Sequence, residues 1–308
     1  MQGSSFILAS RLFDDWQDDV LHGDPPTRYD IGPGLDHVRL GPGMVALLGG
    51  CPGMGKTAFI MQAVVTAMTA DDDLRVCVAN VEMPPQRLLK RQLSRLSDVS
   101  LDNIQERRLS DRQRDRMDEA FDTLDRIADR LVFVTSPMDL DNVADAADSI
   151  DAHWIVLDYI QRIRPSRQSG GGNADDKRGS VDATMDSIRR FADAGCCVTA
   201  LSAVGRTKDS KGRSSYAGDG LNLASFRESS ELEYGADDAF LIVPSPDADA
   251  DDDDAEIDVT LRHLKSRYGK PADCELTFDR SRQRFIAVDA DDDDNARSLR
   301  DELRGLYR

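Results

Sequence analysis

The sequence predicts an α/β fold with a mostly parallel sheet, helices on both faces of the sheet and antiparallel strands added at one edge. Three observations support this prediction. A short apolar run at 45–48 leads into a glycine-rich loop and then a helical segment. Strand and helix patterns alternate from there to about residue 243, which is typical of parallel sheets because each crossover needs a helix. From residue 257 on, strand patterns follow one another without helices, as in antiparallel sheets.

The glycine-rich loop has the sequence signature of a phosphate-binding P-loop. Gly50 is followed after four residues by Gly55, Lys56 and Thr57, between a predicted strand and a predicted helix, as the motif requires. The loop amides and the helix N-terminus attract phosphate, the lysine reaches the outer phosphates, and the threonine hydroxyl binds Mg²⁺. The alternative is a glycine-rich turn with this sequence by chance, which the flanking strand and helix disfavour. We therefore expect ATP and Mg²⁺ to bind here, with the nucleotide held by Gly50, Cys51, Pro52, Gly53, Met54, Gly55, Lys56, Thr57 and Ala58.

Two further strand patterns end in an acidic residue. Asp158 follows the apolar run 155–157 and is expected to be the second anchor for Mg²⁺, through a water molecule. Glu82 follows the strand pattern at 75–81 and is placed to orient and deprotonate an attacking water. Alternatively, Glu82 is a favourable charge at the N-terminus of the helix that starts after Pro84. Spacing alone does not decide between these two interpretations.

The remaining elements complete the alternating pattern. Further strand patterns lie at 131–134, 154–157, 197–201 and 239–243, and the antiparallel additions at 257–264, 274–278 and 285–288. Helical patterns lie at 56–68, 85–96, 111–129, 141–149, 181–194 and 229–234. The helix at 111–129 starts with a capping box formed by Ser110 and Gln113. Two long polar loops, 162–180 and 204–222, leave the C-terminal ends of strands, where open α/β sheets place ligand-binding loops.

The N-terminal segment is predicted to be separate from this core. Apolar residues recur at helical spacing in 8–21, opposite an acidic face, and a Gly-Asp-Pro-Pro break follows at 23–26. The apolar stripe must pack either on this domain or on a neighbouring subunit. We therefore divide the chain into an N-terminal linker helix (1–26), a P-loop ATPase domain (27–289) and an acidic tail with a short helix (290–308).

Composition argues against several classes of protein. The 308 residues carry a net charge of −18, which taken alone argues against a nucleic-acid binder, but Asp-rich runs at 247–254 and 289–294 concentrate this charge. The acidic, lysine-poor composition fits either a high-salt cytoplasm or simply two solvated acidic loops. The five cysteines form no C-x-x-C pair, so we expect core residues and no disulfide or zinc site. With neither an apolar run of membrane-spanning length nor a secretory signal, we expect a cytoplasmic protein without membrane contact.

Several motifs, taken in order, resemble the C-terminal motor domain of DnaB-type replicative helicases. The resemblance runs from about residue 28 to residue 288. It rests on the P-loop, the Glu-Met-Pro at 82–84, the Leu-Asp-Tyr-Ile-Gln at 157–161, the Ala-Leu-Ser at 200–202, the Phe-Arg-Glu-Ser at 226–229 and the Leu-Lys-Ser-Arg-Tyr-Gly at 264–269. The family implies a RecA-like fold, a hexameric ring of identical subunits, ATP hydrolysis at subunit interfaces and movement along single-stranded DNA. The family also implies other replication proteins as partners.

The resemblance also implies roles for individual residues. Glu82 becomes the catalytic base, acting together with Lys56, and Lys265 and Arg267 become a pair that reaches the γ-phosphate of a neighbouring subunit. Such cations neutralise charge that develops on the transferred phosphoryl group. The alternative for this pair is two exposed cations that protect an edge strand from pairing. The N-terminal helix resembles the family's linker helix, which docks on the adjacent subunit.

The loop at 204–222 is the predicted DNA contact. Contacts to single strands need cations and a flexible main chain more than base-specific groups, and glycines flank this cluster. Asp209 and Asp219 dilute the cluster, so a solvated loop is the alternative. The expected DNA-binding residues are Arg206, Lys208, Lys211 and Arg213.

Two departures from the family keep other functions open. The family has a glutamine after Leu-Ser on the fifth strand, where this chain has Ala203, which cannot hydrogen-bond a phosphate through its side chain. We also expect this chain to lack the family's primase-contacting N-terminal domain. A regulatory ATPase of the RecA superfamily, acting on a protein partner without unwinding DNA, is therefore one alternative. A recombinase-like filament former is another.

Overall fold

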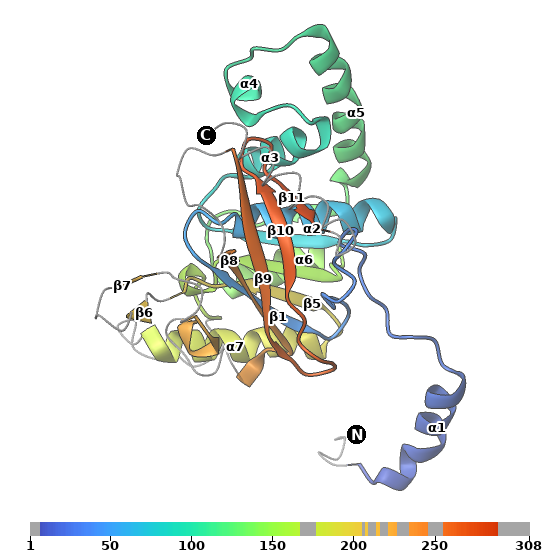
Figure 1. Cartoon of the computed structure of the whole chain (residues 1–308). Helices are drawn as coiled ribbons and strands as arrows, with labels where there is room; N and C mark the ends of the chain where they lie inside the picture. Colours follow the sequence, from blue (N-terminus) through green and yellow to red (C-terminus); the bar gives the residue numbers. More distant parts are fainter. Residues whose placement is uncertain are drawn as a thin grey trace.

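A large twisted sheet forms the centre of the structure (Figure 1). The computed structural model describes residues 7–166, 177–204, 207–208, 214–215, 221–226, 234–245 and 255–288. Within these residues the sheet has nine strands in the order β11-β10-β9-β8-β1-β5-β4-β2-β3. A separate short pair, β6 (Thr207–Lys208) and β7 (Ser214–Ser215), lies inside the loop predicted at 204–222.

The strand directions confirm the predicted fold class. The parallel strands are β1 (Val45–Gly50), β2 (Val76–Asn80), β3 (Leu131–Phe133), β4 (Trp154–Asp158), β5 (Cys197–Leu201) and β8 (Asp238–Pro244). The antiparallel additions at one edge are β9 (Glu256–Ser266), β10 (Cys274–Asp279) and β11 (Arg284–Ala287). Because the first set of strands is parallel, the loops after these strands meet at one end of the sheet.

The helices follow the predicted order with small shifts at their ends. They are α1 (Phe13–His22), α2 (Lys56–Ala70), α3 (Pro85–Ser97), α4 (Leu101–Gln105), α5 (Asp111–Ala128), α6 (Leu140–Ser149) and α7 (Lys177–Asp193), with 3-10 turns at Ala9–Arg11, Ile160–Arg162 and Leu223–Ser225. The capping box of α5 is confirmed. α7 begins four residues before the predicted start at 181, and α4 was not predicted because five residues show no clear period. Most of the helix predicted at 229–234 lies outside the described residues. In the part of the chain that the structure describes, no helix combines the length and apolarity needed to cross a bilayer.

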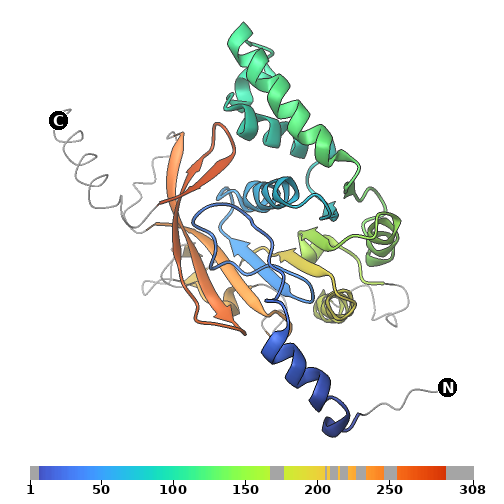
Figure 2. The ribbon, with the colours of Figure 1, turned by 90° about the vertical axis from the view of Figure 1, so that its right-hand side faces the viewer.

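Helices cover both faces of the sheet (Figure 2). The side chains of its strands alternate between the two layers. In β1, Ala46 and Leu48 face the layer of α2, whereas Val45 and Leu47 face the layer of α6 and α7. This alternation follows from the two-residue period of a strand, and burial on both sides explains the nearly continuous apolar sequence of the strands. α2 is itself buried on most sides because α3, α5 and the β10–β11 hairpin lie beyond it.

α1 stands away from the rest of the structure in both views (Figures 1 and 2). It has no buried residue, and Leu12, Phe13, Trp16, Val20 and Leu21 are all exposed, with Trp16 at 57%. The predicted amphipathic helix is therefore present from residue 13, after a 3-10 turn. A contiguous exposed apolar face is unfavourable in water and is typical of a surface that packs on a partner.

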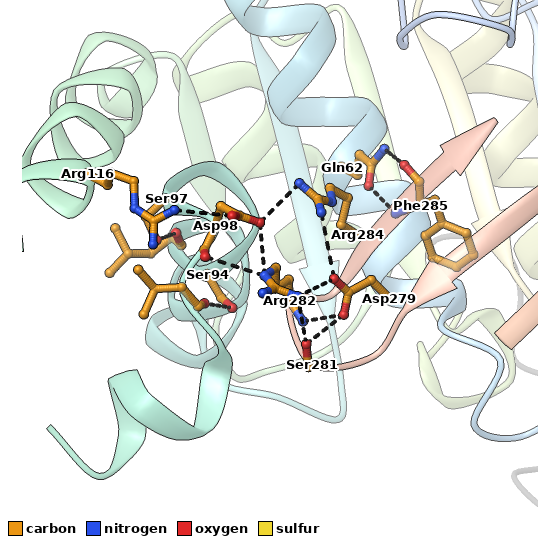
Figure 3. A network of polar contacts seen from close by, with 12 residues as sticks. Gln62, Ser94, Ser97, Asp98, Arg116, Asp279, Ser281, Arg282, Arg284 and Phe285 are labelled. Carbon is orange, nitrogen blue, oxygen red and sulfur yellow. Dashed lines mark hydrogen bonds and ion pairs between the residues drawn. The ribbon is translucent and has the colours of Figure 1, made fainter. Parts of the chain in front are cut away.

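A network of ion pairs joins the helical unit α3–α5 to the β10–β11 hairpin (Figure 3). Asp98 ends α3 in a left-handed conformation, with φ of 54°. Its carboxylate lies 3.2 Å from Arg116 of α5, 2.9 Å from Nε of Arg282 and 3.3 Å from Nη1 of Arg284. One exposed carboxylate thus holds two segments that are far apart in sequence.

Asp279 forms the buried half of this network. Its side chain is 1% exposed and accepts hydrogen bonds from Ser281 Oγ at 2.7 Å and Arg282 Nη1 at 3.0 Å, and Arg284 Nη2 lies at 3.7 Å. Burial alone would raise the pKa of this carboxyl group. The hydrogen bonds from Ser281 and Arg282 outweigh burial and lower the pKa of Asp279 below its ordinary value.

We predict that Asp279→Asn lowers the free energy of unfolding at pH 7 by about 2 kcal/mol, because it leaves two partly exposed arginines without their buried partner. Since the pKa of Asp279 is depressed on folding, its contribution is present above the unfolded pKa of about 4 and is lost as pH falls through the folded pKa. Urea titrations at pH 7 and pH 3 measure both effects.

Asp118→Asn, an exposed change on α5, is the matched control and should leave stability unchanged. A difference between wild type and Asp279→Asn that grows on acidification would contradict this assignment.

Candidate active site

The P-loop connects β1 to α2 and its backbone geometry depends on glycine. At Gly55, φ is 76°, and a Cβ atom would lie 2.7 Å from the ring of Phe278, so a larger residue is excluded by both strain and space. At Gly50, a Cβ atom would lie 2.7 Å from the carbonyl oxygen of Ile242. The loop is therefore held tightly between β8 on one side and the β10–β11 hairpin on the other.

Lys56 begins α2 and its ammonium group lies inside the loop. Nζ donates hydrogen bonds to the carbonyl oxygens of Gly50 at 2.9 Å and Cys51 at 3.2 Å. Burial lowers the pKa of Lys56, and the nearby Asp158 opposes this effect. A phosphate entering the loop would offer the ammonium group a charged partner in place of two neutral carbonyls, which is a stronger interaction.

The two predicted magnesium ligands lie in contact. Thr57 Oγ1 donates to Asp158 Oδ2 at 2.6 Å, although the two residues are separated by 101 positions. The described residues contain no cluster of three or more His, Cys, Asp or Glu side chains that could hold a metal by itself. A hydroxyl and one carboxylate suit Mg²⁺, which usually takes one or two protein oxygens and completes its octahedron with phosphate oxygens and water. The donor set thus fits the predicted ion.

Asp158 is buried and carries an unusual pKa. Burial, assisted by the charge of Glu82, raises its pKa to about 6, although the hydrogen bond from Thr57 and the charges of Lys56 and Arg91 oppose this shift. The positive charges of Lys56 and Arg91 are too weak to offset the burial of this carboxylate. A divalent cation would stabilise its charged form.

Asn80 links this carboxylate to the predicted catalytic base. It lies opposite Asp158 in the β2–β4 register, and its Nδ2 donates to Asp158 Oδ2 at 2.5 Å. Its Oδ1 accepts hydrogen bonds from the backbone N–H groups of Glu82 at 2.9 Å and Met83 at 2.7 Å. Sequence reasoning missed Asn80, because a polar residue that ends an apolar strand has many possible roles.

Glu82 is exposed and lies just before α3. The N-cap of α3 is Pro84 and its first turn contains no acidic residue, so Glu82 lies two positions outside the helix end. Its charge acts on Lys56, Arg91 and Asp158, which places it beside the phosphate loop. Because Glu82 lies before the N-cap of α3 and outside its first turn, this geometry favours the base over the helix-dipole interpretation.

A cavity of about 700 Å³ lies between α3 and α4, and Pro84, two residues after Glu82, is part of its wall. Arg87, Lys90 and Arg91 contribute to its wall. Burial lowers the pKa of Arg91, and Arg87 adds to this shift. The Nε of Arg91 is buried and has no hydrogen-bond partner in the described part of the chain. The sequence shows these cations at helical spacing, but their position beside the site depends on how α3 packs.

Lys265 and Arg267 lie at the opposite end of the sheet from the P-loop. Lys265 pairs with Ala239 near the start of β8, whereas Ile242, further along β8, pairs with Gly50 at the P-loop. Three residues of strand correspond to about 10 Å. β9 is flanked by β8 and β10, but its pairing with β10 ends at Leu261 and Cys274, so Lys265 pairs only with β8. This arrangement does not decide between the interface role and edge protection.

The head groups of this pair point further away from the P-loop. Lys265 Nζ donates to the carbonyl oxygen of Ala236 at 2.7 Å, and Arg267 Nη1 donates to Asp237 Oδ1 at 2.7 Å. Ala236 and Asp237 precede β8 at the end where the parallel strands begin. These cations therefore cannot reach a nucleotide bound to their own P-loop.

The neighbourhood of Ala203 contains a glutamine from another element. Gln161, in the turn after β4, donates from Nε2 to Ser202 Oγ at 2.7 Å and accepts from the backbone N–H of Ala203 at 3.3 Å. An amide side chain thus lies beside the end of β5, but its atoms are occupied by Ser202 and Ala203. Of the predicted DNA-binding residues, Lys208 lies in β6, and Arg206, Lys211 and Arg213 lie outside the described residues.

Comparison with known proteins gives one family. A family model described as the DnaB-like helicase C terminal domain matches residues 34–287. The replicative DNA helicase DnaB of Helicobacter pylori strain J99 is 35% identical over 82 residues, and that of strain 26695 is 34% identical over 82 residues. Each alignment covers 27% of this chain but only 16% of the relative.

Solved structures show the same fold. A DnaB-like replicative helicase, described with its interactions with primase, aligns with a TM-score of 0.71 over 92% of this chain and 67% of that one. A second structure, described as an ATPase domain, aligns with a TM-score of 0.72 over 91% of this chain and 98% of that one. Both are 17% identical to this chain, so they support the fold and not particular residues.

We predict that Asn80→Ala lowers kcat for ATP hydrolysis by roughly 10- to 100-fold with a smaller change in KM, because Glu82 loses the side chain that fixes its backbone. Steady-state kinetics measure both constants. The control is Asn142→Ala, whose side chain binds loop carbonyls of Thr135 and Pro137. An unchanged kcat in Asn80→Ala would remove Asn80 from the site.

Proposed function

Because the chain belongs to the DnaB-like helicase C-terminal domain family, we propose that it is an ATP-driven motor that moves along single-stranded DNA during replication. The observation that carries this proposal is the division of the site between the two ends of the sheet. The P-loop, Glu82 and Asp158 lie at one end, and Lys265 and Arg267 lie at the other. A complete site therefore requires two subunits.

Within one subunit, the P-loop amides and Lys56 bind and orient the phosphates of ATP. Thr57 and Asp158 hold Mg²⁺, which when bound neutralises phosphate charge. Glu82 accepts the proton of the attacking water as the water oxygen bonds to the γ-phosphorus and the bond to the bridging oxygen breaks. Asn80 fixes the backbone that carries Glu82.

A neighbouring subunit supplies Lys265 and Arg267. Their charges stabilise the phosphoryl group in transit, a contribution of about 10³–10⁵ in rate for such cations. A closed ring of six subunits gives every site a neighbour. The exposed apolar face of α1, carrying Leu12 and Trp16, packs on the adjacent subunit and holds the ring together. The protein works in the cytoplasm with other replication proteins.

The loop between β5 and β8 contacts DNA. Arg206, Lys208, Lys211 and Arg213 bind successive phosphates of a single strand in the centre of the ring. The loop leaves the end of β5 that lies beside the P-loop strand, so a change at the nucleotide reaches it through a short path.

One other function has a specific observation in its favour. Ala203 offers no side-chain hydrogen bond, and the net charge is −18, which suits a regulatory ATPase that acts on a protein partner. ATPase rates with and without single-stranded DNA, together with strand displacement of a forked duplex, separate the two functions across a range of KCl concentrations. Absence of DNA stimulation at every salt concentration would favour the regulator.

We predict that Glu82→Gln binds ATP with an affinity close to that of wild type and loses nearly all turnover, because the amide cannot accept the proton of water. Binding of a fluorescent ATP analogue and release of phosphate measure the two properties. Glu119→Gln on the exposed face of α5 is the control. Full turnover by Glu82→Gln would refute its role as the base.

We predict that replacing Arg206, Lys208, Lys211 and Arg213 by Ala weakens binding to oligo-dT and lowers the slope of log affinity against log salt by up to about 3 units. Fluorescence anisotropy over a salt series measures this slope. Arg112→Ala combined with Arg114→Ala, on the exposed side of α5, removes positive charge elsewhere. An unchanged slope in the loop variant would place DNA contact outside this loop.

A further inference from the structure

Asp237 is a buried carboxylate at the end of the sheet where Lys265 and Arg267 lie. Its side chain is 0% exposed. Oδ2 accepts hydrogen bonds from the backbone N–H of Val45 at 2.8 Å and from Arg189 Nη1 at 2.8 Å. Oδ1 accepts from Arg267 Nη1 at 2.7 Å. The nucleotide site described above makes no use of this residue.

Backbone hydrogen bonds also fix the main chain of Asp237. The N–H of Asp237 donates to the carbonyl oxygen of Val45 at 2.7 Å, and the N–H of Arg267 donates to the carbonyl oxygen of Asp237 at 2.9 Å. Val45 is the first residue of β1, whose far end leads into the P-loop. Asp237 therefore connects the strand of the phosphate loop directly to the cation that serves the neighbouring subunit.

The contact with Asp237 leaves most N–H donors of the Arg267 guanidinium group available to another partner. Only Nη1 is bound to Asp237, and the Arg267 side chain is 44% exposed. A guanidinium group carries five N–H donors in a rigid fork, so one fixed nitrogen sets the direction of the other donors. Arg189 occupies Oδ2 and so prevents the carboxylate from taking Arg267 in a bidentate pair.

We propose that Asp237 is the positioning residue for Arg267, and that Arg189 keeps the Asp237 carboxylate to a single bond with Arg267 so that the remaining donors point toward the phosphate of a neighbouring subunit. This inference rests on the proposed action of Arg267 across the subunit interface. A fixed orientation removes the entropy cost of ordering a long side chain during the reaction. Lys265 lies next to this cluster on the carbonyl oxygen of Ala236 and shares its positive field.

A purely structural anchor is the alternative, because Asp237 also holds the start of β1. The variant Asp237→Asn separates the two roles. An asparagine oxygen can still accept from Val45 or Arg189, whereas the uncharged amide no longer forms an ion pair with Arg267. We expect kcat to fall by roughly 10- to 100-fold while KM for ATP stays within about twofold, since the P-loop is unchanged. Asp193→Asn, an exposed change on α7, is the control for loss of one acidic charge and should keep wild-type kinetics.

Subunit mixing provides the decisive measurement. Asp237→Asn subunits have an intact P-loop and a misplaced Arg267, and Lys56→Ala subunits have the opposite defect. Rings assembled from both types contain interfaces where an intact P-loop faces a correctly placed Arg267. The ATPase activity per Asp237→Asn subunit should therefore rise well above that of the unmixed variant. A merely structural defect gives no such recovery. The mixture of Arg267→Ala with Lys56→Ala tests the underlying premise in the same assay.

Each result has a distinct meaning. Recovery in both mixtures supports the proposal. Recovery with Arg267→Ala but not with Asp237→Asn contradicts the role of Asp237 and leaves the proposed function intact. No recovery in either mixture contradicts action across the interface. If Asp237→Asn does not fold, Arg189→Met takes its place: it should show a smaller loss of kcat that is recovered by Lys56→Ala subunits, and full wild-type activity of Arg189→Met would overturn the proposal.

Discussion

The direction of the strands decides which charged groups one subunit can bring together. The parallel strands place the P-loop, Glu82 and Asp158 at the end where these strands finish. β9 is antiparallel to β8 and places Lys265 and Arg267 at the end where the parallel strands begin. No change of side-chain rotamer moves these cations across the length of a strand. The separation is therefore a property of the fold itself.

The isolated subunit also has two unsatisfied features. The buried carboxylate of Asp158 has too little positive charge around it, and burial raises its pKa to about 6. In the described part of the chain, the apolar residues of α1 are exposed. The missing partners are a cation with phosphate in the first case and, on our proposal, a second subunit in the second. Both features are costly in the isolated chain, and on our proposal both become favourable in an assembled, nucleotide-bound ring.

The sequence predicted those parts of the site that depend on local pattern. The P-loop is a contiguous motif, and Asp158 follows an apolar run, so neither depends on tertiary structure. Asn80 and Asp237 were missed because their roles come from register: Asn80 matters because it lies opposite Asp158, and Asp237 because β8 begins beside Val45. The ion pairs of Asp98 with Arg282 and Arg284 were missed for the same reason, since they join segments about 180 residues apart.

The most direct test is the ATPase rate per subunit measured over a range of protein concentrations, with the assembled fraction determined in parallel by mass photometry. If each site is completed by a neighbour, turnover per subunit follows the assembled fraction, and diluted monomers bind ATP but hydrolyse it poorly. Full turnover by monomers would contradict the account, because it would mean that one subunit contains every group the reaction needs.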